Sequence, residues 1–208
     1  MKVARYHAYG DPSVLRYEDI DRPRPEQDHV LLRVAATAFN PVDATIRAGY
    51  LQQAFPIRLP HTPGFDVAGT VAELGPGATG LAVGDAVVGF LPMTEDGAAA
   101  EFVVAPAVAL TAAPTNVPLT DAAALPSASL TAWQALFEHA DLQAGQRVLI
   151  NGAGGGVGGF AVQFAKQAGA TVVATASARS APVVAAAGAD QIVDYTSTTL
   201  ANAIGEPA

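Results

Sequence analysis

The feature of this chain that most constrains its fold is a glycine-rich stretch between an apolar run and a helical pattern. Residues 148–150 are Val, Leu and Ile, which suit a parallel strand covered on both faces. Glycine is abundant from Gly152 onward, and apolar residues recur at helical spacing from Val157 to Ala168. Gly169 then suits the residue after a helix end. The stretch predicts a strand, a tight turn and a helix.

The small residues of this turn match the spacing of a dinucleotide-binding fingerprint, whose three positions fall on Ala153, Gly155 and Gly158. The first position has Ala where Gly is usual. Gly155 would let the backbone approach a pyrophosphate, and Gly158 would let the helix pack closely on the strand. Unpaired N–H groups at the helix start favour phosphate. The predicted cofactor contacts in the turn are Ala153, Gly154, Gly155, Gly156, Val157 and Gly158.

A glycine-rich turn can also be a plain connector that binds nothing. The next segment favours the nucleotide-binding interpretation, because the β-branched run 170–175 starts directly after the helix and completes a βαβ unit. A weak helix at Ala181–Ala187 and a third strand at Gln191–Tyr195 follow, and another helix could start within Thr196–Ala208. Since a full dinucleotide-binding domain has six strands, these three predict only its first half.

Cofactor choice depends on the end of the second strand. An NAD site needs an acidic side chain there to accept hydrogen bonds from the ribose. The segment 175–180 has no acid, and instead offers Ser177, Arg179 and Ser180 as donors. A carboxylate would repel a 2′-phosphate, whereas Arg179 could pair with it. The sequence therefore predicts NADPH as the cofactor.

The N-terminal part is expected to be rich in β-structure, because Pro and Gly clusters separate short apolar runs without helical segments between them. This pattern suggests a closed or partly closed antiparallel barrel. Near Thr120 the sequence pattern changes from β-rich to helical. Thr120 and Asp121 could cap a short helix that Pro126 ends or kinks. Residues Leu130–His139 are expected to form a further helix. The expected strands are Lys2–His7, Val30–Ala38, Asp66–Leu74, Asp85–Phe90 and Ala99–Val104.

Composition excludes several function classes. Half of the 208 residues are hydrophobic and only 14% are charged, so a substantial core is available. The net charge of −8 argues against general binding to nucleic acid or to a membrane surface. The chain has no cysteine, which rules out disulfides and thiolate zinc sites, and its start lacks a signal-peptide core. We expect a cytoplasmic protein without nucleic-acid or membrane partners.

Several further segments stand in a definite order along the chain: Asn40–Asp43 with Arg47 and Gly49, Pro63–Val71, Val83–Val87, Leu125–Trp133 and the glycine motif through Lys166. Together they resemble the medium-chain dehydrogenase/reductase superfamily, and the zinc-free quinone oxidoreductase branch fits best. The resemblance implies a mixed fold: an N-terminal GroES-like β-barrel domain over 1–120, and an incomplete Rossmann-type α/β dinucleotide-binding domain over 121–208.

Zinc-dependent members of this superfamily carry a Cys in the segment that corresponds to Asn40–Asp43, and Gly-His-Glu where this chain has Gly64, Phe65 and Asp66. Phe65 cannot ligate a metal. The four histidines show no ligand spacing, and solvated or packing roles are expected for them. His61 is either a residue that contacts substrate or a polar surface residue, and the surface role is favoured. We therefore expect no metal site.

For the zinc-free branch the resemblance implies hydride transfer from NADPH to a quinone or an α,β-unsaturated carbonyl. Asn40 would hold the nicotinamide ribose or the substrate carbonyl, while Asp43 is either part of this site or a structural acceptor. Arg47 is either an ion-pair partner of Asp43 or an active-site cation, and the ion pair is favoured. The Thr131 hydroxyl would lie near the nicotinamide, or else face the neighbouring helical turn.

Two further expectations complete the interpretation. Tyr195 matches a family tyrosine beside the adenosine phosphate, and its alternative is a half-buried aromatic at a strand end. A homodimer is expected, and these 208 residues alone could be inactive because half of the nucleotide domain is missing. The competing function is a non-catalytic NADPH-binding sensor or structural protein of the same fold.

Overall fold

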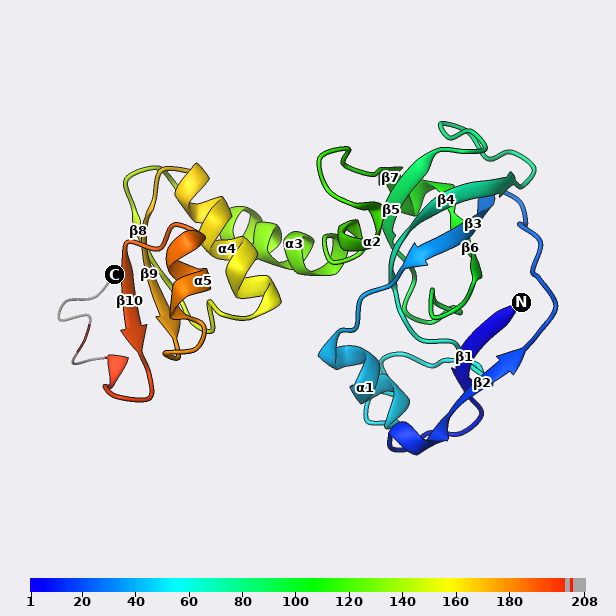
Figure 1. Cartoon of the computed structure of the whole chain (residues 1–208), viewed down its shortest axis with the longest axis horizontal. Coiled ribbons are helices and arrows are strands. Elements are labelled where there is room, and N and C mark those ends of the chain that lie inside the picture. Colours follow the sequence, from blue (N-terminus) through cyan, green and yellow to red (C-terminus); the bar gives the residue numbers. More distant parts are fainter. Residues whose placement is uncertain (201–202, 204–208) are drawn as a thin grey trace. The chain divides into compact units, whose positions relative to one another are not determined.

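The computed structural model describes residues 1–200 and Ala203. The chain divides into two compact units, Met1–Pro126 and Ser127–Ala208, which we call unit 1 and unit 2 (Figure 1). The division falls after residue 126, whereas we expected a domain boundary after residue 120.

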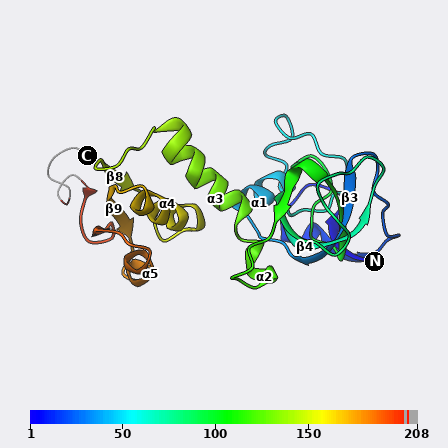
Figure 2. The ribbon, with the colours of Figure 1, turned by 90° about the horizontal axis from the view of Figure 1, so that it is seen from above.

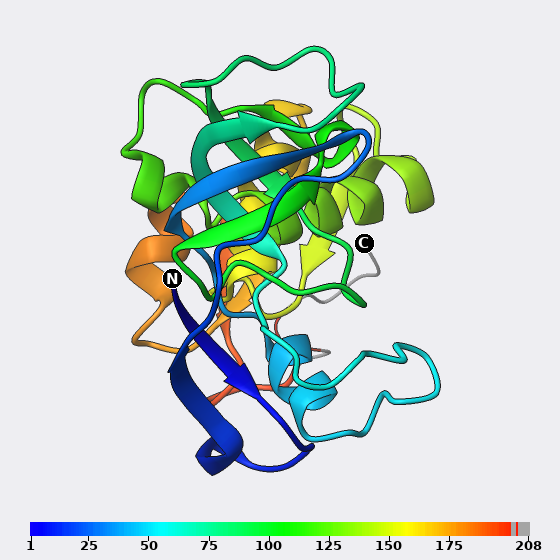
Figure 3. The same cartoon turned by 90° about the vertical axis from the view of Figure 1, so that its right-hand side faces the viewer.

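Unit 1 is built from antiparallel strands. Its main sheet has five strands in the order β6-β3-β4-β5-β7, and a separate pair joins β1 (Lys2–Tyr6) to β2 (Leu15–Asp19). Figure 3 shows this pair, in dark blue, apart from the larger sheet. The five strands of the main sheet are β3 (His29–Ala36), β4 (Asp66–Leu74), β5 (Ala86–Phe90), β6 (Phe102–Pro106) and β7 (Leu110–Ala112).

Apolar side chains on one face of this sheet form the core of unit 1. Val30 and Leu32 of β3 are fully buried, as is Val67 of β4. Residues two apart in a strand point to the same side, so the alternation in the sequence places them together. Phe65 and Leu91, at the ends of β4 and β5, pack against the same cluster.

The expectation that no helix interrupts the strands of unit 1 was wrong. Helix α1 (Pro41–Arg47) lies between β3 and β4, with Asn40 as its N-cap residue and Pro41 as its first residue. Both residue types are favoured at these positions. Strands β2 and β7 were also missed, and β6 begins at Phe102 instead of Ala99. Unit 1 also contains two single-turn 3-10 helices, η1 (Pro12–Val14) and η2 (Ala107–Ala109).

The helical segment that links the two units also differs from expectation. Helix α2 (Leu119–Ala122) begins after Pro118, so Thr120 and Asp121 lie within it instead of capping it. Pro126 does not end this helix but begins α3 (Pro126–Trp133), and a π-helical segment, η3 (Gln134–His139), continues it. Proline suits the first turn of a helix because its missing N–H would have no partner there.

Unit 2 contains a parallel sheet of three strands in the order β10-β9-β8, consisting of β8 (Arg147–Ile150), β9 (Thr171–Ala176) and β10 (Gln191–Asp194). Helix α4 (Gly156–Gln167) joins β8 to β9, and α5 (Ala181–Ala186) joins β9 to β10. Both helices contact β9 (Figure 2). This order is that of the first half of a dinucleotide-binding fold.

The core of unit 2 lies between α4 and the sheet. Ala161, Val162 and Ala165 of α4 are buried against Val172 and Ala174 of β9.

Among the residues that the structure describes, no helix is long and apolar enough to cross a membrane. The helix expected to start within Thr196–Ala208 falls partly outside the described residues, since 201–202 and 204–208 are not described.

Candidate functional site

The glycine turn connects β8 to α4 in the predicted place. Gly152 has a φ of +72°, in the left-handed region that favours glycine, and its carbonyl accepts a hydrogen bond of 3.0 Å from the Gly155 N–H. Gly155 is the N-cap residue of α4. The turn therefore ends where the unpaired N–H groups of the helix begin.

The two key glycines of the turn face different surroundings. A Cβ atom on Gly158 would lie 2.4 Å from the Gly152 carbonyl oxygen and 2.7 Å from the Ala153 Cα atom. On Gly155 the nearest atom to such a Cβ would be the Gly152 oxygen, at 3.4 Å, and the residue is exposed. Close packing thus explains Gly158, whereas the space beside Gly155 is open to a ligand.

Other small residues of the turn serve the local packing. Ala153 is buried, and its N–H donates to the Thr175 carbonyl at 3.1 Å. A Cβ atom on Gly154 would lie 2.5 Å from the Ser180 Cβ, so this glycine allows the start of α5 to approach the turn. Gly156 and Val157 are exposed in the first turn of α4.

The predicted donors after β9 lie together in one short loop. The Ser180 hydroxyl accepts a hydrogen bond of 3.2 Å from the Ser177 N–H and lies 3.2 Å from the Ser177 hydroxyl. The exposed Arg179 side chain makes no hydrogen bond or ion pair with any other described residue. Tyr195 directly follows β10 and is 58% exposed, so it lies at the strand end with part of its side chain covered.

Thr175 was not predicted as a site residue. Its side chain is fully buried on β9, and its hydroxyl hydrogen-bonds to both Asn151 and Gly152. A threonine inside a β-branched run is typical of any strand, so the sequence pattern carried no signal for these contacts.

In unit 1, Asn40 and Asp43 are held in a network of hydrogen bonds. The Asp43 carboxylate accepts from the Asn40 N–H at 2.8 Å and from the Gly64 N–H at 3.1 Å. The Asn40 amide donates to the buried Asp66 carboxylate at 2.8 Å. Burial raises the pKa of Asp43, and the Asp66 charge adds to this effect. Asp43 therefore ties the start of α1 to the loop before β4.

The expected ion pair between Arg47 and Asp43 is not formed. The Arg47 Nε atom instead donates a long hydrogen bond, 3.3 Å, to the Gly10 carbonyl. Both oxygens of Asp43 are taken by backbone N–H groups, which satisfies this carboxylate without a cation. Arg47 and Asp43 both line a mostly apolar cavity of about 220 Å³, together with Leu15, Phe39 and Pro63.

Thr131 lies on α3 in unit 2. Its hydroxyl donates a hydrogen bond of 2.7 Å to the Ser127 carbonyl, one turn earlier in the same helix. This contact is the alternative foreseen for Thr131, although the exposed oxygen could still accept a hydrogen bond.

The residues considered for a metal site have other roles. Phe65 is buried, and its ring meets Phe90 edge-on with 5.6 Å between centroids. His61 is only 5% exposed and packs edge-on against Tyr6, so the expectation of a surface histidine was wrong. Within residues 1–200 and Ala203, no three His, Asp or Glu side chains are grouped as metal ligands would be.

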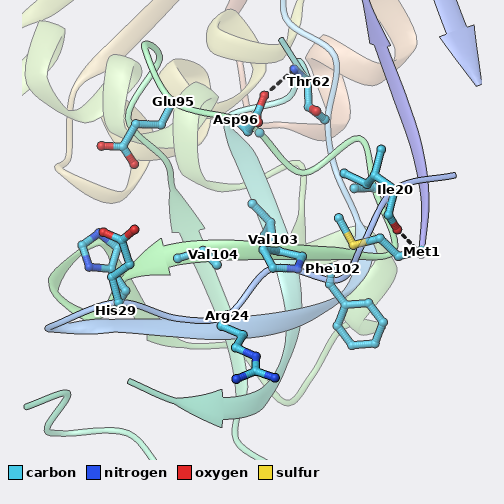
Figure 4. Close-up of a pocket in the computed structure, with 14 residues that line it drawn as sticks. Met1, Ile20, Arg24, His29, Thr62, Glu95, Asp96, Phe102, Val103 and Val104 are labelled. Atoms are coloured by element: carbon cyan, nitrogen blue, oxygen red, sulfur yellow. Dashed lines mark hydrogen bonds between the residues drawn. The ribbon is translucent and has the colours of Figure 1, made fainter. Parts of the chain in front are cut away.

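A second cavity in unit 1, of about 430 Å³, contains none of the predicted site residues (Figure 4). Two hydrogen bonds join groups of its lining: the N-terminal amine donates to the Ile20 carbonyl at 2.6 Å, and the Thr62 N–H donates to Asp96 at 2.6 Å. Phe102 and Val103 contribute apolar surface. No sequence motif therefore supports this cavity as the functional site.

The chain is similar in sequence to a known domain family and to known oxidoreductases. Residues 26–115 match the family described as the alcohol dehydrogenase GroES-like domain. The chain is 39% identical over 201 residues to a chloroplastic quinone-oxidoreductase homolog from Spinacia oleracea, covering 94% of this chain and 61% of the relative. It is 37% identical over 207 residues to a chloroplastic NADPH-dependent alkenal/one oxidoreductase from Arabidopsis thaliana, covering 94% and 53%.

A solved structure gives the same result for the fold. The quinone oxidoreductase from Coxiella burnetii matches with a TM-score of 0.91 and 34% identity, over 100% of this chain and 66% of that protein. The chain thus spans about three fifths of the length of the first curated relatives that it matches.

Proposed function

Because the chain belongs to the quinone oxidoreductase branch of the medium-chain dehydrogenase/reductase superfamily, we propose that it serves NADPH-dependent reduction of a quinone or an α,β-unsaturated carbonyl. The names of its relatives support both acceptor classes. The chain covers only part of the length of each relative. The activity is therefore proposed for a protein of the relatives' length that contains this chain.

The observation that carries the proposal is the turn from Gly152 to Gly158. Open space lies beside Gly155, and α4 begins directly after it with backbone N–H groups that have no partner within the helix. These groups and the helix dipole suit a pyrophosphate. The residues present therefore fit the phosphate half of a dinucleotide, and bound NADPH would supply the hydride for reduction.

The loop after β9 supports NADPH in preference to NADH. Arg179 is exposed and has no partner within the described residues, so its guanidinium group is available to a 2′-phosphate. Ser177 and Ser180 would add hydroxyl donors from the same loop. Tyr195, exposed after β10, would lie on the adenosine side.

On the acceptor side we assign different roles to the predicted residues. Asn40, oriented by its bond to Asp66, would contact the ribose or the substrate carbonyl. Asp43 is assigned a positioning role, because both of its oxygens already accept backbone hydrogen bonds. Arg47 is the cation that lines the adjacent apolar cavity, and Thr131 would accept a hydrogen bond from the nicotinamide side.

The proposed reaction needs no zinc, since an electron-poor acceptor takes a hydride without a metal Lewis acid and Phe65 cannot bind a metal. In this reaction the protein orients the two reactants and excludes water. The homodimer and the cytoplasmic location expected from the sequence stay predictions.

The test is NADPH oxidation with a panel of quinones and enones, compared between the wild-type protein and a variant that cannot bind NADPH. Turnover with one acceptor class supports the proposal and identifies the substrate. Tight NADPH binding without turnover on any acceptor, by a protein of the relatives' full length, would favour the alternative, a non-catalytic NADPH sensor or structural protein. Absence of NADPH binding would contradict both.

A further inference from the structure

Thr175 makes hydrogen bonds to three consecutive residues where the chain leaves β8 and enters the glycine turn, Asn151, Gly152 and Ala153. Its hydroxyl accepts from the Gly152 N–H at 2.8 Å and donates to the Asn151 Oδ1 atom at 2.7 Å. Its carbonyl accepts from the Ala153 N–H at 3.1 Å. One residue on β9, through its hydroxyl and its carbonyl, thus fixes the first three residues that leave β8.

The direction of these bonds follows from the chemistry of a hydroxyl group. A threonine hydroxyl has a single proton to donate. Because the Gly152 N–H already donates to this oxygen, the threonine proton goes to the Asn151 Oδ1 atom. The Asn151 amide then directs its NH₂ group away from Thr175. The Thr175 side chain is fully buried, so water cannot replace either partner.

Gly152 links Thr175 to the part of the turn where the cofactor is proposed to bind. The Gly152 carbonyl accepts the Gly155 N–H at 3.0 Å, and Gly155 caps α4. The same carbonyl lies against Gly158, where no Cβ could fit. Gly152 is therefore held at its N–H by Thr175 and at its carbonyl by the start of the helix.

We propose that the Thr175 hydroxyl is a positioning group for dinucleotide binding, which holds the turn so that Gly155 and the first N–H groups of α4 face the pyrophosphate. This inference rests on the proposed NADPH site. It differs from a packing role, because it assigns the effect to the hydroxyl and not to the buried methyl group of the same side chain.

The experiment compares two substitutions at this position in the 208-residue protein, with NADPH affinity measured by fluorescence titration and folding by thermal unfolding. Thr175→Val keeps the shape but leaves the Gly152 N–H without its partner, and should weaken NADPH binding about tenfold. Thr175→Ser keeps the hydroxyl and loses the methyl group, so it should be less stable but bind NADPH within about twofold of wild type.

Thr171→Val is the matched control, because Thr171 begins the same strand with an exposed side chain. It should leave NADPH affinity unchanged. Equal affinity of Thr175→Val and wild type would overturn the inference, as would an equal loss in the Val and Ser variants, which would show a packing role. If the unsubstituted protein does not bind NADPH, the proposed function fails as well.

A second variant keeps the inference testable if Thr175→Val does not fold. Asn151→Ala lies at an exposed position and removes only the acceptor of the hydroxyl proton. We expect NADPH binding several-fold weaker than wild type, with little change in the unfolding temperature. Unchanged affinity in Asn151→Ala would then contradict the role of the hydroxyl.

Discussion

The Gly152 carbonyl lies so close to Gly158 that a Cβ atom on Gly158 would be 2.4 Å from its oxygen. Because the contact is with backbone, no side-chain rotation can relieve it. Gly159, the next residue of α4, has nothing nearer than 3.9 Å to its own Cβ position. Two neighbouring glycines of one helix therefore have opposite tolerance for a side chain.

Gly158→Ala should lower the free energy of unfolding by roughly 1–3 kcal/mol, because the added methyl group forces the helix away from the turn. Gly159→Ala is the matched control and should raise it by roughly 0.5–1 kcal/mol, since Ala favours helix over Gly. Denaturant unfolding of both variants measures the difference. Equal stability of the two would contradict the close contact.

Gly155→Val should leave the protein folded and abolish NADPH binding. The φ of −90° at Gly155 is open to any residue, and a Cβ would meet only the Gly152 oxygen at 3.4 Å. The side chain would instead occupy the space proposed for the pyrophosphate. Titration with NADPH and circular dichroism check the two parts, with Gly159→Ala as the control. Normal NADPH binding by Gly155→Val would make the turn a plain connector.

The sequence predicted the elements whose signal is local. The strand at Asp66–Leu74 was predicted with its observed bounds, because its apolar residues show the period of a strand. The glycine fingerprint likewise placed the start of α4 to within one residue, Val157 against the observed Gly156, since the turn chemistry is contained within seven residues, 152–158. Helix α1 was missed although Asn40 and Pro41 are ordinary start signals, because the segment is short and weakly periodic.

Contacts between distant segments could not be predicted. The bond from Arg47 to the Gly10 carbonyl joins residues 37 apart, and it replaces the expected pairing with Asp43. The burial of His61 depends on its backbone pairing with Tyr6, which no local pattern reveals. The role of Thr175 likewise depends on the register between β9 and β8, which pairs Ala174 with Ile150 and which the sequence pattern did not give.

Arg179→Ala should weaken NADPH binding about ten- to a hundred-fold and leave NADH binding nearly unchanged. A hydrogen bond to a charged group contributes roughly 1.5–3 kcal/mol. NADH has no 2′-phosphate, so it does not make this bond and its affinity does not depend on Arg179. Paired titrations with the two cofactors measure this effect. Arg147→Ala, at the start of β8, is the control and should affect neither cofactor. Equal loss for both cofactors would refute the role of Arg179.

Purified protein should contain well below one zinc ion per chain, and a chelator should not change its NADPH affinity. Phe65 is buried against Phe90 where a histidine ligand would be needed, and the sequence has no cysteine. Elemental analysis with a protein standard of known zinc content checks the stoichiometry. Zinc at one ion per chain, with function lost on chelation, would overturn the proposed metal-free reaction.

Below about pH 6.5, the free energy of unfolding should fall as the pH is lowered, and His61 should cause part of this fall. Burial lowers the pKa of His61 in the folded protein, and the Asp96 carboxylate, 3.8 Å from its Nδ1 atom, opposes this only partly. In the unfolded chain the pKa returns to about 6.5. Between the two values the unfolded chain binds more protons, so acidification favours unfolding.

Urea unfolding at several pH values should therefore show a weaker pH dependence in His61→Phe, which keeps a ring beside Tyr6, than in wild type. Substitution of the exposed His139 by Gln should leave the dependence unchanged. Parallel curves for wild type and His61→Phe would show that His61 does not contribute to the acid sensitivity.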